Sequence, residues 1–126
     1  MSRKLVLVAD DQEPIRTMLK MSLEFMGYEV AAAENGKMLL TLARERVPDL
    51  IITDVMMPEM TGYEALEELR KDEALKAVPV IVLTALEEAS YREKSTSYGA
   101  CEHLVKPISL PVLKSKVKRI LELATG

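Results

Sequence analysis

Acidic, hydroxyl and basic side chains recur at the ends of apolar runs in this sequence. Asp10 and Asp11 follow the run LVLVA, Asp54 follows LIIT, and later apolar runs end at Thr84 and Lys106. A carboxylate at the end of a buried strand costs free energy unless a partner or an ion compensates its charge. These five residues are therefore the first candidates for a functional site.

The candidate residues suit phosphoryl chemistry supported by a metal ion. Three carboxylates close together repel one another, so they must take up protons, pair with Lys106 or hold a cation. Oxygen ligands without histidine or cysteine favour a hard ion such as Mg²⁺. An aspartate can act as a nucleophile and become an aspartyl phosphate, while a metal, an ammonium and a hydroxyl neutralise the transferring group. Asp54, on the third predicted strand, is the best candidate for the attacking carboxylate.

Apolar runs of strand length alternate with amphipathic segments of helix length. The predicted strands are 4–9, 28–34, 49–55, 78–85 and 102–107. The predicted helices are 13–27, 37–47, 61–75, a helix around 87–98, and a last one that begins near Ser109 and Pro111. The apolar positions of the last helix predicted to face the core are Leu110, Leu113, Val117, Ile120 and Leu121. Its other face carries the basic residues Lys114, Lys116, Lys118 and Arg119.

Five strand-then-helix units predict a doubly wound α/β fold. Strands that are apolar throughout, not alternating, are typical of a parallel sheet covered by helices on both faces. Right-handed crossovers leave few topologies for such a chain. Ligands bind in these sheets where the carboxyl ends of the strands meet the following loops. A flavodoxin-like five-stranded parallel sheet, in the order 2-1-3-4-5 with five helices, would gather the five candidate residues around one crevice.

Composition sets the broad class of the protein. The chain has 126 residues, the usual size of one domain, so we expect a single domain over 1–126. A net charge of −3 argues against direct nucleic-acid binding. The single Cys101 fits a reducing cytosol. The sequence shows neither a signal peptide nor an apolar run of bilayer length, so we expect a soluble, cytoplasmic protein without membrane contact.

Four short motifs lie at predicted strand ends: ADD at 9–11, DVMMPEMTG at 54–62, TA at 84–85 and KP at 106–107. Together, in this order, they resemble the signature of response-regulator receiver domains, and the resemblance extends from Lys4 to about Leu123. It implies the 2-1-3-4-5 strand order. It also implies a phosphoacceptor switch of a two-component signalling system.

The resemblance implies partners as well as a reaction. A sensor histidine kinase or a phosphotransfer protein would donate the phosphoryl group. A downstream effector protein or a fused output domain would bind the face formed by the fourth helix, the fifth strand and the fifth helix. Receiver domains catalyse only their own Mg²⁺-dependent phosphorylation and slow dephosphorylation, so we expect no other enzymatic activity. We expect a monomer or a weak dimer.

By the same resemblance, Asp54 would be the phosphoacceptor. Asp11, Asp54 and the backbone carbonyl of Met56 would ligate Mg²⁺ or Mn²⁺, and Asp10 would assist through a water molecule. A carbonyl ligand leaves the side chain at position 56 free to vary, which explains how a methionine can stand there.

Three more positions take roles from the resemblance. Lys106 would hold the phosphoryl oxygens as a point charge, and Thr84 would move inward to hydrogen-bond another of them. The bond between Lys106 and Pro107 is cis in the family. Position 103 departs from the usual pattern, because His103 stands where receivers often have tyrosine or phenylalanine. His103 could act as a planar switch sensitive to pH, or it could be a half-exposed residue of an edge strand.

Three other classes of function are open to an α/β chain of this kind. A flavodoxin-type flavin site needs a phosphate-friendly loop after the first strand, and the acidic DDQE would repel the phosphate. A phosphohydrolase with an aspartate nucleophile normally has a second acid two residues later, where this chain has Met56. The remaining alternative is a phosphorylation-independent protein-interaction domain with a vestigial acidic pocket, and the intact set of acids argues against it.

Overall fold

The fold is built on a five-stranded sheet, seen here in a computed structural model that describes residues 3–55, 57–84 and 102–123. The strands are β1 (Leu5–Ala9), β2 (Glu29–Ala33), β3 (Leu50–Asp54), β4 (Val80–Thr84) and β5 (Glu102–Val105). All neighbouring strands are parallel, and their order is β2-β1-β3-β4-β5. The predicted flavodoxin-like, doubly wound α/β fold is therefore confirmed.

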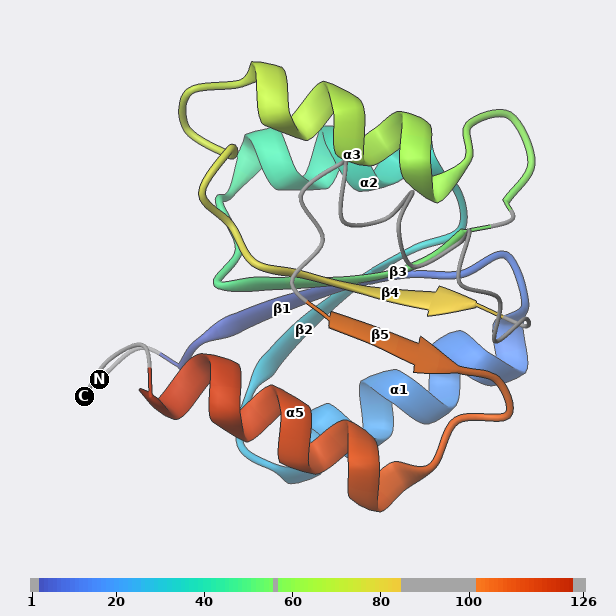
Figure 1. The fold of residues 1–126 in the computed structure, drawn as a ribbon, viewed down its shortest axis with the longest axis vertical. Helices are drawn as coiled ribbons and strands as arrows, with labels where there is room; N and C mark the ends of the chain where they lie inside the picture. Colours follow the sequence, from blue (N-terminus) through green and yellow to red (C-terminus); the bar gives the residue numbers. More distant parts are fainter. Residues whose placement is uncertain (1–2, 56, 85–101, 124–126) are drawn as a thin grey trace.

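Helices cover both faces of the sheet (Figure 1). They are α1 (Glu13–Phe25), α2 (Gly36–Glu45), α3 (Gly62–Lys71) and α5 (Leu110–Leu123). Figure 1 shows α2 and α3 on one face and α1 and α5 on the other. The predicted helix around 87–98 lies outside the described residues, as do Ala85 and Cys101. No helix within the described ranges is long and apolar enough to cross a membrane.

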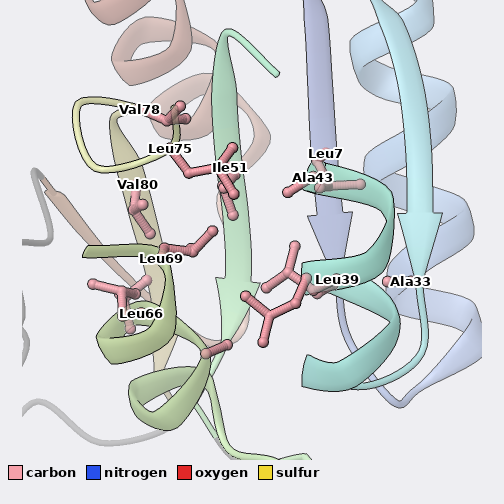
Figure 2. Packing of buried hydrophobic residues seen from close by; sticks show 14 of the residues in the cluster. Leu7, Ala33, Leu39, Ala43, Ile51, Leu66, Leu69, Leu75, Val78 and Val80 are labelled. Carbon is pink, nitrogen blue, oxygen red and sulfur yellow. The ribbon is translucent and has the colours of Figure 1, made fainter. Parts of the chain in front are cut away.

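The three central strands β1, β3 and β4 are mainly apolar because both of their faces are buried. Every residue of β1, β3 and β4 is buried. Leu39 of α2, Leu69 of α3 and Ile51 of the central strand belong to one buried cluster, part of which is drawn in Figure 2. On the opposite face, α1 and α5 contribute buried side chains, namely Leu19, Leu23, Leu113, Val117 and Leu121. Two layers of helix thus hold the strand ends in fixed positions.

The helix predicted over 61–75 is shorter than expected. It begins with a capping box, in which the Thr61 hydroxyl accepts from the Glu64 N–H at 3.1 Å and the Glu64 carboxylate accepts from the Thr61 N–H at 2.9 Å. It ends at Lys71 because the Asp72 carboxylate accepts from the Ala74 N–H at 2.9 Å and closes a local turn that competes with the helix. Leu75 is buried although it lies outside the helix. The apolar spacing therefore predicted the burial of its side chain correctly but not its backbone conformation.

The prediction that Leu110 faces the core is wrong. Its side chain is 36% exposed, whereas Leu113, Val117 and Leu121 are buried and Ile120 packs against the core from its edge. Leu110 is the first residue of α5, where no preceding helical turn exists for a side chain to cover. The apolar stripe therefore begins one turn later than predicted.

Two basic residues of α5 bind the edge strand β5. The Glu102 carboxylate accepts from Lys116 Nζ at 2.6 Å and also from Arg119. The hydrogen bond from Lys116 is the largest cause that holds the pKa of Glu102 below its ordinary value. Two of the four basic residues on the polar face of the last predicted helix thus bind the sheet.

Glu102→Gln should lower stability at neutral pH and have less effect in acid. The lowered pKa of Glu102 means that its ion pairs stabilise the fold above the unfolded pKa, near 4.5, and are lost as the pH falls through the folded pKa. We expect a loss of about 0.5–1 kcal/mol at pH 7 that shrinks below pH ~4.5. Urea unfolding between pH 7 and pH 3 measures it, with Glu24→Gln on α1 as the control. If the difference in the free energy of unfolding between the wild type and Glu102→Gln stayed constant with pH, the ion-pair account would be contradicted.

Gly62→Ala should destabilise the protein sharply. An added Cβ would lie 2.2 Å from the backbone oxygen of Asp54, so the chain would have to move at the end of β3. We expect the free energy of unfolding to fall by about 2–3 kcal/mol. The control is Gly27→Ala, where φ is +98° but no atom lies within 4 Å, and we expect a loss of about 1 kcal/mol. Equal losses at the two glycines would contradict the contact as the cause.

Candidate functional site

The carboxyl ends of four strands bring the candidate residues to one edge of the sheet. Asp54 ends β3 and aligns with Leu83 of β4, and Thr84 is the next residue of β4. Thr84 aligns with Val105 of β5, so Lys106 follows directly beside it, and the Lys106 N–H donates to the Thr84 carbonyl at 2.7 Å. Asp10 and Asp11 follow β1, which lies on the other side of β3. The predicted convergence at this edge is therefore observed.

Three carboxylates form a compact group at this edge. Asp10, Asp11 and Asp54 each offer an oxygen, and these three atoms all lie within 4.8 Å of one another. Asp10 has no exposed surface, Asp54 is 6% exposed and Asp11 is open to solvent. The group thus extends from the interior to the rim of the sheet.

Lys106 offsets part of this negative charge. Its Nζ lies 3.0 Å from Asp10 Oδ2 and 3.1 Å from Asp54 Oδ2. Burial of the ammonium disfavours its charge, but the hydrogen bonds and charges of the two carboxylates outweigh burial, so the pKa of Lys106 is raised above 10.5. Lys106 is thus held in its charged form. The peptide bond to Pro107 is cis, as the resemblance implied.

The loop after β1 is held by contacts that sequence reasoning missed. The Asp10 N–H donates to the Ala33 carbonyl at 3.1 Å, and Asp10 Oδ1 accepts from the Gln12 N–H at 2.9 Å. Arg16 of α1 donates from its guanidinium to the Asp10 backbone carbonyl at 2.8 Å. The sequence does place a basic residue, Arg16, in the first turn of the helix that follows the two acids. Its contact with Asp10 could not be predicted, because it depends on how the loop between β1 and α1 folds.

A polar pocket of about 260 Å³ opens beside Asp11. Its other lining residues are Glu34, Asn35, Pro58 and Glu59. Asn35 caps α2 by accepting from the Met38 N–H at 2.8 Å, and its amide donates to Glu59 at 3.3 Å. Three of the five lining residues are acidic, so an anionic substrate would meet repulsion here unless a cation were bound.

The donor set fits a hard divalent cation. All of the clustered ligand atoms are carboxylate oxygens, which suit Mg²⁺ or Mn²⁺. Two oxygens on one Mg²⁺ can lie at most about 4.2 Å apart, because each Mg–O distance is about 2.1 Å. The three carboxylate oxygens lie within 4.8 Å of one another, so the cluster is close to the size that a single ion requires.

The remaining predicted site residues are Thr84, His103 and Met56. Thr84 is 6% exposed. His103 is partly buried and aligns with Val82, two residues before Thr84 on β4. Side chains two residues apart lie on the same face of a strand, so His103 and Thr84 share one face of the sheet. Met56 lies outside the described residues.

Known proteins share both this fold and much of this sequence. Chemotaxis protein CheY4 of Vibrio cholerae matches with a TM-score of 0.91 and 34% identity, over 95% of this chain and 100% of that chain. Probable transcriptional regulator ycf27 of Porphyra purpurea is 40% identical over 119 residues, which cover 94% of this chain and 48% of that protein. Phosphate regulon transcriptional regulatory protein PhoB of Pseudomonas aeruginosa is 36% identical over 118 residues, which cover 94% of this chain and 52% of that protein.

The chain spans about half the length of these two curated transcriptional regulators. Residues 6–118 match the family described as the response regulator receiver domain, a signalling module of two-component systems. The chain therefore belongs to the response regulator receiver domain family.

Proposed function

We propose that this domain is a phosphoacceptor switch in which Asp54 receives a phosphoryl group from a phosphohistidine. The observation that carries the proposal is the gathering of three carboxylates and one ammonium at the carboxyl edge of the sheet. This arrangement combines a nucleophile, a candidate cation site and a fixed positive charge.

Burial and contacts favour Asp54 over the other two acids as nucleophile. Asp10 is fully buried, and its two carboxylate oxygens contact the Gln12 N–H and Lys106. Asp11 is exposed at the rim, on the loop after β1. Asp54 ends the central strand, keeps slight exposure and is held by Lys106. A rigidly placed carboxylate beside a cation is well suited to receive a phosphoryl group.

The transfer forms one bond and breaks one bond. A carboxylate oxygen of Asp54 attacks phosphorus, a new P–O bond forms, and the P–N bond to the donor imidazole breaks with its electron pair on nitrogen. Lys106, charged and close to Asp54, would stabilise the negative phosphoryl oxygens. Asp11, Asp54 and the Met56 carbonyl would hold Mg²⁺ or Mn²⁺, with Asp10 reached through water. When bound, that ion would neutralise charge on the phosphoryl oxygens.

The signal would travel through Thr84 and β5. Thr84 is the last residue of β4, and its backbone carbonyl accepts a hydrogen bond from the Lys106 N–H. We infer that phosphorylation draws the Thr84 hydroxyl inward, with His103, on the same face of the sheet, as the coupled switch residue. New contacts made only in the phosphorylated state would shift the balance between two conformations. The face that includes β5 and α5 would then bind an effector protein or a fused output domain.

The wider setting is part of the same proposal. The donor would be a sensor histidine kinase or a phosphotransfer protein in the cytoplasm. We propose a monomer or weak dimer that binds neither nucleic acid nor membrane through this domain. Its only catalysis would be its own phosphorylation and slow dephosphorylation.

Asp54→Asn should abolish phosphorylation. Acetyl phosphate and Mg²⁺ should add one phosphoryl group to the wild-type chain, and intact-mass spectrometry detects the addition. Without the carboxylate nucleophile the addition should fall below detection. Asp72→Asn, which removes a carboxylate that pairs with Arg44 and does not belong to the acidic cluster, should be labelled as the wild type is.

Two outcomes would contradict this assignment. Labelling retained by Asp54→Asn would place the acceptor elsewhere. A wild-type chain that stays unlabelled with Mg²⁺ present would favour the alternative of a phosphorylation-independent interaction domain with a vestigial pocket.

Asp11→Asn should stabilise the metal-free protein and remove its response to Mg²⁺. Loss of one charge from the carboxylate group should raise the free energy of unfolding in EDTA by about 0.5–1 kcal/mol. Mg²⁺ at ten times its Kd should raise the free energy of unfolding of the wild type by about 1.4 kcal/mol and that of the variant by much less. Urea unfolding with and without Mg²⁺ measures both effects, with the exposed Glu45→Gln as control. An undiminished Mg²⁺ response would exclude Asp11 as a ligand.

A further inference from the structure

Asp10 leaves the sheet through an unusual set of backbone contacts. Its N–H still donates to the Ala33 carbonyl of β2 at 3.1 Å, as a strand residue would. Its carbonyl instead accepts from the Arg16 guanidinium at 2.8 Å. The chain turns away from the sheet at this peptide, because α1 begins at Glu13.

The peptide whose carbonyl Arg16 holds is the one that leads into Asp11. The Asp10 side chain is already fixed by the Gln12 N–H and by Lys106, and Asp10 has no exposed surface. These contacts leave the plane of the Asp10–Asp11 peptide unfixed. The orientation of this plane determines the direction in which the Asp11 side chain points. Asp11 itself is exposed, so packing does little to orient it.

Arg16 stands on a rigid support. It is the fourth residue of α1 and is partly buried. The same helix is anchored to the sheet by Leu19 and Leu23, which have no exposed surface. A charged donor in a fixed position makes a strong hydrogen bond to a carbonyl and resists rotation of the peptide.

We propose that Arg16 is a positioning residue for the divalent-cation site: it holds the Asp10–Asp11 peptide so that the Asp11 carboxylate is oriented toward Asp54. The inference rests on the proposed metal-binding function. The expected effect of Arg16 is opposite to that of its charge alone, because a positive side chain near the acids should by itself weaken the binding of a metal ion. The sign of the effect therefore separates positioning from charge.

Arg16→Met should weaken Mg²⁺ binding about tenfold, which is about 1.4 kcal/mol at 25 °C. Titration of Mg²⁺ alone, followed by the amide NMR signals of Asp11 and Asp54, measures the Kd without reference to activity. Arg16→Lys, which keeps a donor on a flexible stem, should fall between the wild type and Arg16→Met.

Arg70→Met is the matched control. Arg70 also donates from its guanidinium to backbone carbonyls, those of Lys76 and of Val78, the latter at 3.1 Å, in the segment between α3 and β4. Its loss should lower stability but leave the Mg²⁺ Kd unchanged.

Three results would overturn the inference. Unchanged or tighter Mg²⁺ binding by Arg16→Met would show that no positioning occurs. Equal weakening by Arg70→Met would assign the effect to general destabilisation. A wild-type chain that binds no Mg²⁺ would overturn the proposed function and this inference with it, whereas the first two results leave the proposed function intact.

Discussion

Repulsion among like charges at the carboxyl edge of the sheet is the constraint on which this structure depends. Three carboxylates lie within a few ångströms, and one of them is fully buried. Lys106 contacts two of the three and holds its own proton more tightly as a result. The excess negative charge that remains makes the edge a natural place for a cation and, once a cation is bound, for a phosphoryl group.

The rest of the fold keeps these charges in place. Strands β1 and β3, which lead into the three acids, and their neighbour β4 are buried on both faces, so their ends cannot move without disturbing two helical layers. Close backbone contact at Gly62 fixes the exit from β3. Arg16 and Gln12 hold the loop after β1 by hydrogen bonds to Asp10. The fold therefore holds the carboxylates close together despite their repulsion, and a bound cation can reduce this repulsion.

Much of this arrangement could be predicted from the sequence, because it depends on short-range pattern. Apolar runs of strand length located the five strands, and the polar residues at the ends of four of these runs identified the acids, Thr84 and Lys106. Arg16 could not be predicted in the same way, because its contact depends on how the loop folds back after β1. The end of α3 was misplaced because a local turn at Asp72 competes with the helix, and apolar spacing carries no information about that turn. Leu110 has the correct helical spacing but lies at a helix terminus.

The central claim is that the acids at this edge share one divalent ion. Anomalous diffraction from crystals of the protein soaked in Mn²⁺ tests it most directly, because it locates the ion without reference to activity. The account predicts one strong peak within bonding distance of Asp11 and Asp54, with Asp10 farther away. A peak elsewhere on the molecule, or no peak at this edge at saturating Mn²⁺, would contradict it.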